Sequence, residues 1–189
     1  MSGKGPALSK KGRKVMSQSV VFYLLISVFT LTYFNSWMVL FCTATMPGPK
    51  LMSGVIFGVA EASSCLLSGL MVRSIKDSYA VTMFCIIGIF TTTVFYYTGG
   101  TDTGLLGSVL LFGEVFSIGA ILSLTYVLVE TRVPPESFGS TTVLCVTSAL
   151  ICSGFSQFFA RGEGIIPTAT IVFVFASISI MTLSLPIGG

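Results

Sequence analysis

Residues 19–43, SVVFYLLISVFTLTYFNSWMVLFCT, form a continuous apolar run without a charged side chain. Because a helix rises about 1.5 Å per residue, this run is long enough to cross a hydrocarbon core of roughly 30 Å. It follows residues 1–18, which carry five basic residues and no acidic one. A secretory signal peptide has a shorter apolar region and a small-residue cleavage site. We therefore interpret the run as a retained membrane-spanning helix behind a basic tail.

Five further runs share this character, at residues 51–71, 80–97, 104–129, 138–160 and 165–185. Charged residues make up 9% of the 189-residue chain, whereas a soluble domain carries about 25%. Of the charged residues, only Glu61 and Glu114 lie inside the six runs. This partition predicts an all-α membrane protein with six transmembrane helices, comprising a basic cytoplasmic tail (1–18) and a six-helix bundle (19–189). It excludes a soluble enzyme, a nucleic-acid-binding protein and a disordered chain.

The turns and prolines support the same division. Short turn sequences separate the runs, and all seven prolines lie in tails, turns or outermost helical turns. Because the connections are short, we expect consecutive helices to be antiparallel neighbours without an extramembrane domain. A division into two sets of three helices is a further symmetry that such a chain could contain.

The residue types that are missing exclude several chemistries. The chain has no His, which removes Ser-His and Cys-His catalysis and His-ligated metals. Its five cysteines lie in apolar runs without a Cys-x-x-Cys pair. Small buried side chains are the favoured role for them, with a disulfide or a metal site as the alternative. We predict no enzymatic activity, no cofactor and no metal site.

The basic residues predict the orientation in the membrane. With a cytoplasmic N-terminus, the cytoplasmic side collects the five basic residues of the tail together with Arg73, Lys76 and Arg132, whereas the opposite side has only Lys50 and Arg161. This asymmetry follows the positive-inside rule and places both termini in the cytoplasm. The tail then orients the first helix, and binding to anionic headgroups is its alternative role.

The two acidic residues inside the runs are the main candidates for chemistry. A carboxylate in hydrocarbon costs several kcal/mol, so each should face a cavity, meet a partner or be protonated. At helical spacing Glu61 shares a stripe with Gly54, Gly58, Cys65 and Ser68, and Glu114 shares one with Gly107, Ser117 and Ile121, beside Gly113. The functional interpretation is a substrate or proton site. The alternative is an acid that forms a structural hydrogen bond between helices.

Other polar residues are candidates for the same pathway. Tyr33 and Asn35 lie within the first run, and Gln157 lies beside a small-residue stripe in the fifth, formed by Thr141, Cys145, Ser148, Cys152 and Ser156. Such stripes serve either helix packing or a pore lining. We include Tyr33, Asn35 and Gln157 with the two acids as predicted substrate-binding residues.

Two loop sequences, GLMVRSIKDS (residues 69–78) and YVLVETRVPPESFGS (residues 126–140), make the chain resemble a known family. It is similar to the C-terminal six-helix half of a major facilitator superfamily transporter, in the organic-cation, organic-anion and sugar-porter-like branch. Gly69 and Lys76 match the first loop motif, in which Arg73 stands where the family has an acidic residue. Glu130, Pro134 and Gly139 match the second motif, and the GVAEASS sequence around Glu61 is similar to the corresponding organic-ion helix.

This resemblance implies solute transport of the facilitator type, with an organic ion or a proton as substrate. It also implies conformational loop motifs at Gly69, Arg73, Lys76, Glu130, Arg132 and Gly139. Family members need about twelve helices in two halves around a midplane site, so a homodimer or a second six-helix half is the expected partner. A truncated piece of a longer protein, and an inactive relic, are alternatives. A different class also stays open, a non-transporting integral membrane subunit or scaffold.

The orientation can be tested by cysteine labelling from outside the cell. We expect a probe in TGGTDTG (residues 98–104) to be labelled and one in RSIKDS (residues 73–78) to be protected, because the basic residues place these turns on opposite sides. The reverse labelling would contradict this topology.

Overall fold

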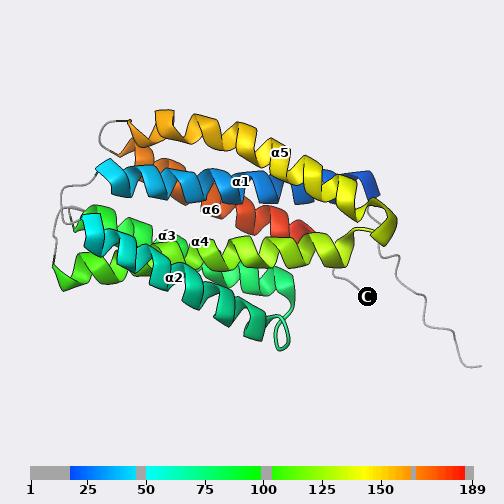
Figure 1. The fold of residues 1–189 in the computed structure, drawn as a ribbon, viewed down its shortest axis with the longest axis horizontal. Helices are drawn as coiled ribbons and strands as arrows, with labels where there is room; N and C mark the ends of the chain where they lie inside the picture. Colours follow the sequence, from blue (N-terminus) through cyan, green and yellow to red (C-terminus); the bar gives the residue numbers. More distant parts are fainter. Residues whose placement is uncertain (1–17, 46–49, 99–103, 163–164, 186–189) are drawn as a thin grey trace, which may run out of the picture.

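The structure, a computed structural model, describes residues 18–45, 50–98, 104–162 and 165–185. Within these ranges it contains six α-helices and no strand (Figure 1): α1 (Gln18–Thr45), α2 (Lys50–Met71), α3 (Asp77–Tyr97), α4 (Leu105–Arg132), α5 (Pro135–Ala160) and α6 (Ile166–Ser184). Each helix is long and apolar enough to span a membrane. The prediction of an all-helical bundle with six candidate spans is therefore confirmed. The predicted basic tail lies outside the described residues, except for Gln18, which begins α1.

The helices extend past the apolar runs at several ends. Helix α3 begins at Asp77 rather than at residue 80, α4 continues to Arg132 rather than to 129, and α5 begins at Pro135 rather than at 138. Apolar patterning locates only the part of a helix that lies in hydrocarbon, and polar residues continue the terminal turns. Proline fits the first turn of α5 because that position has no intrahelical partner for an N–H group.

The helices pack around a central pair, α1 and α4. Helix α1 contacts α5, α4 and α6, and α4 contacts α3, α2 and α1, while α3 and α6 pack on each other. In Figure 1, α5, α1, α4 and α2 follow one another across the view, with α6 and α3 behind them. The expectation that consecutive helices are neighbours holds fully only for α3 and α4. It is wrong for α1 and α2 and for α2 and α3, because α1 packs mainly on α5, α2 packs mainly on α4, and α3 packs on α4 and α6. A short connection only keeps the ends of two helices close together. Which helices pack along their length depends on the faces that carry small residues.

The packing also divides the bundle into two sets of three helices. Exchanging α1, α2 and α3 for α4, α5 and α6 turns the α1–α5 pair into the α4–α2 pair. It turns the α1–α6 pair into the α4–α3 pair, and it leaves the α1–α4 and α3–α6 pairs unchanged. The main helix contacts thus follow the twofold division that the sequence allowed.

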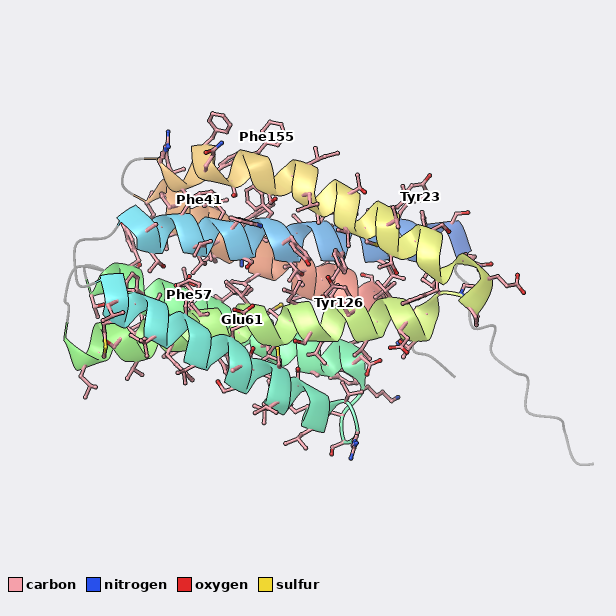
Figure 2. The ribbon with its side chains drawn as sticks, viewed as in Figure 1. Tyr23, Phe41, Phe57, Glu61, Tyr126 and Phe155 are labelled. Carbon is pink, nitrogen blue, oxygen red and sulfur yellow. The ribbon has the colours of Figure 1, made fainter. Side chains whose placement is uncertain are left out.

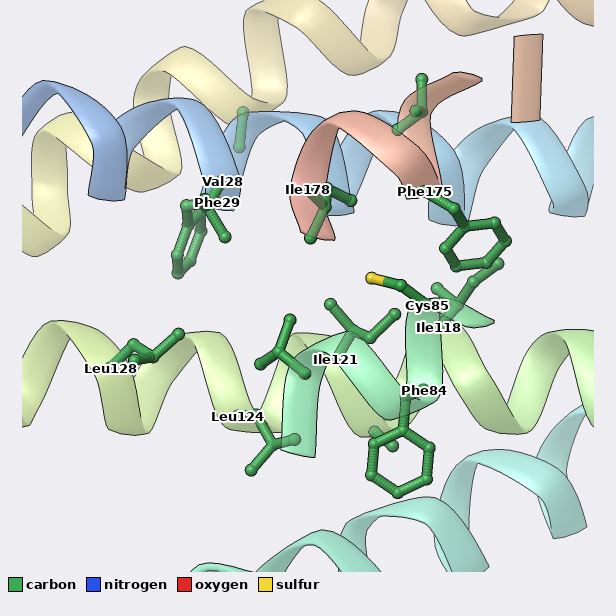
Figure 3. Packing of buried hydrophobic residues seen from close by; sticks show 14 of the residues in the cluster. Val28, Phe29, Phe84, Cys85, Ile118, Ile121, Leu124, Leu128, Phe175 and Ile178 are labelled. Atoms are coloured by element: carbon green, nitrogen blue, oxygen red, sulfur yellow. The ribbon is translucent and has the colours of Figure 1, made fainter. Parts of the chain in front are cut away.

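The apolar core lies between the four helices α1, α3, α4 and α6 (Figure 3). Phe29 of α1, Phe84 of α3, Leu124 of α4 and Phe175 of α6 are each at most 1% exposed. The outer helix α2 has only 17% of its span buried, against 50% for α4. Helix α2 therefore flanks the core, while α5 contributes the small buried side chains Cys145, Ala149 and Ala160 to it.

Two glycines allow the closest helix contacts. A Cβ atom on Gly88 of α3 would collide with the ring of Phe175 on α6, and a Cβ atom on Gly119 of α4 would collide with the Ser64 hydroxyl on α2. Glycine lets the backbones approach, which is a common basis of helix association in membranes.

The contact between α3 and α6 can be tested by adding one methyl group. We expect Gly88→Ala to lower stability by about 1–3 kcal/mol, because the buried Phe175 ring must move. Gly154→Ala, on an exposed position of α5 with open space around its Cβ atom, is the matched control. Thermal unfolding in detergent measures both, and equal midpoints for the two variants would contradict the contact.

Candidate functional site

Glu61 lies at the middle of α2 and is exposed on the surface of the bundle. It lines a cavity of about 40 Å³ between α2, α1 and α4, together with Ser36 and Val39 of α1, Phe57 of α2, and Val115, Ile118, Gly119 and Leu122 of α4. Figure 2 shows Glu61 and Phe57 on α2 beside α4. A cavity of this size holds a few water molecules or a small ion. A larger solute would meet Glu61 only from its exposed side.

The position of Glu61 follows from the contact between α2 and α4. Gly119 lies against Ser64, and a Cβ atom there would be 3.6 Å from the Glu61 Cα atom. The predicted stripe of small residues around Glu61 divides in the structure. Gly54 and Gly58 are exposed, with open space where a Cβ atom would stand, whereas Ser68 is buried. Gly54, Gly58 and Glu61 therefore lie on a side of α2 that no other helix in the described part of the chain covers.

Glu114 lies inside the bundle and is only 5% exposed. Its Oε1 atom accepts a hydrogen bond of 2.8 Å from the Thr92 hydroxyl on α3. Gly113 beside it allows a close approach of α3, since a Cβ atom there would be 2.7 Å from Cγ2 of Thr91. Glu114 does not line the cavity of Glu61, although its neighbour Val115 does. This placement matches the alternative of an acid hydrogen-bonded between helices, and a substrate-binding role for Glu114 stays a prediction.

Asn35 of α1 is a buried amide with no hydrogen-bond partner among the residues that the structure describes. It is 1% exposed, and neither Nδ2 nor Oδ1 forms a hydrogen bond within the described part of the chain. An unsatisfied buried polar group costs about 1–3 kcal/mol, so such a group usually binds water or a ligand. The next residue, Ser36, lines the Glu61 cavity. Asn35 itself does not line that cavity, so its role in substrate binding stays a prediction.

Tyr33 lies in a contact between the two central helices. Its hydroxyl is 2.8 Å from the hydroxyl of Tyr126 on α4, and Phe29 packs against both rings with centroid distances of 5.1 and 4.9 Å. This arrangement joins α1 to α4. Neither Tyr33 nor Tyr126 lines the Glu61 cavity, so the structure does not bring Tyr33 together with Glu61.

The small-residue stripe of α5 serves helix packing. Thr141, Cys145 and Ser156 are buried, and the Ser148 hydroxyl is 3.0 Å from the Thr30 hydroxyl of α1. Gln157 is half-buried near the end of α5 and does not line the Glu61 cavity. The structure therefore does not bring Gln157 together with Glu61.

The predicted loop-motif residues divide into two groups. Arg73, Lys76 and Arg132 line one cavity at the end of the bundle where α2 ends, α3 begins and α4 ends. Gly69, Glu130 and Gly139 are exposed and lie outside this cavity. The three basic residues are thus the ones that the fold brings together.

Two side chains of these sites were missed by sequence reasoning. Ser36 follows Asn35 directly, so the sequence shows two adjacent polar residues. It does not show that Ser36 lies on the side of α1 that faces the Glu61 cavity. Thr92 lies in a run of three threonines, and only the packing of α3 on α4 selects it as the partner of Glu114.

The fold and these polar groups define a class, a multi-pass helical membrane protein with polar side chains between its helices. No protein-family model, curated protein or solved structure matches the chain. In the part of the chain that the structure describes, His, Cys, Asp and Glu residues form no group that could hold a metal ion.

The bond between Thr92 and Glu114 can be tested by removing its donor. We expect Thr92→Val to lower stability by about 1 kcal/mol, because the buried carboxyl group loses a hydrogen bond between helices. Thr93→Val is the matched control, since within the described ranges the Thr93 hydroxyl bonds the Ile89 carbonyl of its own helix and no other helix. Thermal unfolding in detergent provides the comparison. Equal losses in both variants would argue against a special role of the interhelical bond.

Proposed function

We propose that this chain is one half of a facilitator-type membrane transporter and that Glu61 binds its substrate, a small organic cation or a proton. The observation that carries the proposal is the place of Glu61 in the fold. It is an exposed carboxyl group at the middle of a spanning helix, beside the contact of the two central helices. A carboxylate at this depth in hydrocarbon is unfavourable unless a cation or a proton accompanies it.

The twofold division of the helices supports the same proposal. Many transporters consist of two sets of helices related by an internal symmetry, and their substrate sites lie near the midplane where the sets meet. Here the exchange of the two sets relates α1 to α4 and α2 to α5. Glu61 and Ser36 lie at this meeting place. Asn35, whose side chain has no hydrogen-bond partner in the described part of the chain, is adjacent to Ser36 in sequence. The resemblance of the loop sequences to the major facilitator superfamily agrees with this arrangement.

A second six-helix unit is part of the proposal. Alone in a membrane, α2 would present Glu61 to lipid, at a cost of about 2.5–3.5 kcal/mol for a charged residue at mid-helix. A second copy of the chain, or a separate half, would cover this side and remove the cost. With the positive-inside orientation, both termini and the turn between α2 and α3 lie in the cytoplasm.

A non-transporting subunit or scaffold is the second candidate. The observation that favours it is the small size of the Glu61 cavity, about 40 Å³, which does not enclose an organic solute. Under this alternative Glu61 binds a partner helix rather than a substrate.

Uptake into vesicles separates the two candidates. We expect the full chain, reconstituted alone or with a candidate second half, to take up labelled tetraethylammonium. Glu61→Gln should abolish uptake because it removes the negative charge at the open site. Glu136→Gln, which removes an exposed carboxylate in the first turn of α5, is the matched control and should retain uptake. Glu114→Gln tests the substrate-binding role predicted for Glu114, which requires that this variant also lose uptake.

Two results would change this account. Loss of uptake in Glu136→Gln to the same extent as in Glu61→Gln would show that uptake does not depend on the Glu61 carboxylate in particular. Absence of uptake of tetraethylammonium and of protons by every preparation would favour the scaffold.

A further inference from the structure

A basic cavity lies at one end of the bundle, away from Glu61. It has a volume of about 500 Å³ and is formed by the turn between α2 and α3 and by the last turns of α4 and α6. This is the right-hand end in Figure 1. Arg73 and Lys76 reach it from the turn, and Arg132 reaches it from α4. Asp77 is the single acidic residue among its lining side chains, so positive charge exceeds negative charge there.

Arg132 gives the cavity an unmet hydrogen-bonding group. Its Nη1 atom is buried and has no hydrogen-bond partner among the described residues. A buried guanidinium nitrogen is costly without an acceptor, and the oxygens of a phosphate group match the planar guanidinium well. Arg132 lines the cavity through its other atoms, and together with Arg73 and Lys76 it favours an anion with several acceptor oxygens.

The backbone adds to this preference. Helix α3 begins at the cavity, and Lys76 at its N-cap position forms no side-chain capping bond. The first N–H groups of a helix and the positive end of its dipole favour an anion. The Asp77 carboxylate in the first turn offsets part of this field, and the three basic side chains exceed it.

We propose that this cavity binds the phosphate group of an anionic phospholipid. The basic residues supply the headgroup contacts, and Leu183 and Leu185 at the end of α6 supply an apolar wall beside them. The cavity lies where four spanning segments end, which is the level of lipid headgroups. With the proposed orientation it faces the cytoplasmic leaflet, where anionic lipids are concentrated. The inference does not depend on transport by the chain.

Native mass spectrometry of the full chain in mild detergent tests this site. We expect phosphatidylglycerol to bind at least about tenfold more tightly than phosphatidylcholine with the same acyl chains, as charge-assisted contacts require. Arg132→Gln should remove this preference. Arg73→Gln with Lys76→Gln should remove it as well, and because both side chains are exposed, this double variant should fold. Arg161→Gln, at the far end of α5, is the matched control and should keep the preference.

Three outcomes would overturn the proposal. The first is equal binding of the two lipids, and the second is an equal loss of preference in Arg161→Gln and in the cavity variants. The third concerns the source of the phosphate. If inorganic phosphate alone protects the wild-type chain from thermal unfolding as well as phosphatidylglycerol does, and the cavity variants lose that protection, the ligand is a soluble phosphate compound.

Discussion

The contact between α1 and α4 is the interaction on which the rest of the bundle depends. The Tyr33 and Tyr126 hydroxyls meet there at 2.8 Å, and Phe29 packs against both rings. Every other helix then packs on one member of this pair, α5 and α6 on α1, and α2 and α3 on α4. Because hydrocarbon offers no hydrophobic drive for helices to associate, such contacts rely on close packing and on hydrogen bonds between helices. Glycines allow the close approach of the outer helices: Gly88 between α3 and α6, Gly113 between α4 and α3, and Gly119 between α4 and α2.

The two intramembrane acids show how the same chemistry serves different purposes. Glu114 is surrounded by protein and accepts a hydrogen bond from the Thr92 hydroxyl. The free-energy cost of burying its carboxyl group is therefore reduced within the fold. Glu61 remains exposed beside a small cavity. The free-energy cost of its charge in hydrocarbon can therefore be offset only by a group from outside the bundle. A substrate cation, a proton or a second six-helix unit can each supply this. The proposals of transport and of pairing both derive from the exposure of the Glu61 carboxyl group at mid-helix.

The sequence predicts the six helices well because the exclusion of charge from hydrocarbon acts on each segment separately. Helix ends are less predictable, as Asp77 and Pro135 show, because polar residues extend the helices beyond the apolar runs. Neighbour relations depend on which faces fit, and turn length did not reveal that α2 packs on α4. Glu61 and Asn35 could be selected from the sequence as polar groups in apolar runs. Their different surroundings, and the choice of Thr92 as a partner, depend on helix rotations that only the packed bundle determines.

Helix pairing is the central claim, and disulfide cross-linking tests it most directly. Native Cys65 of α2 lies 3.4 Å from the Ser123 hydroxyl of α4, and Thr30 of α1 lies 3.0 Å from Ser148 of α5. A protease site in the turn at residues 98–104 would separate α1–α3 from α4–α6, with the cysteines not under test replaced by serine. After oxidation and cleavage, Ser123→Cys with Cys65, and Thr30→Cys with Ser148→Cys, should keep the two fragments joined. Cys65 with Ser148→Cys should not. Fragments that separate in both test pairs, or that stay joined equally in the control, would contradict the arrangement.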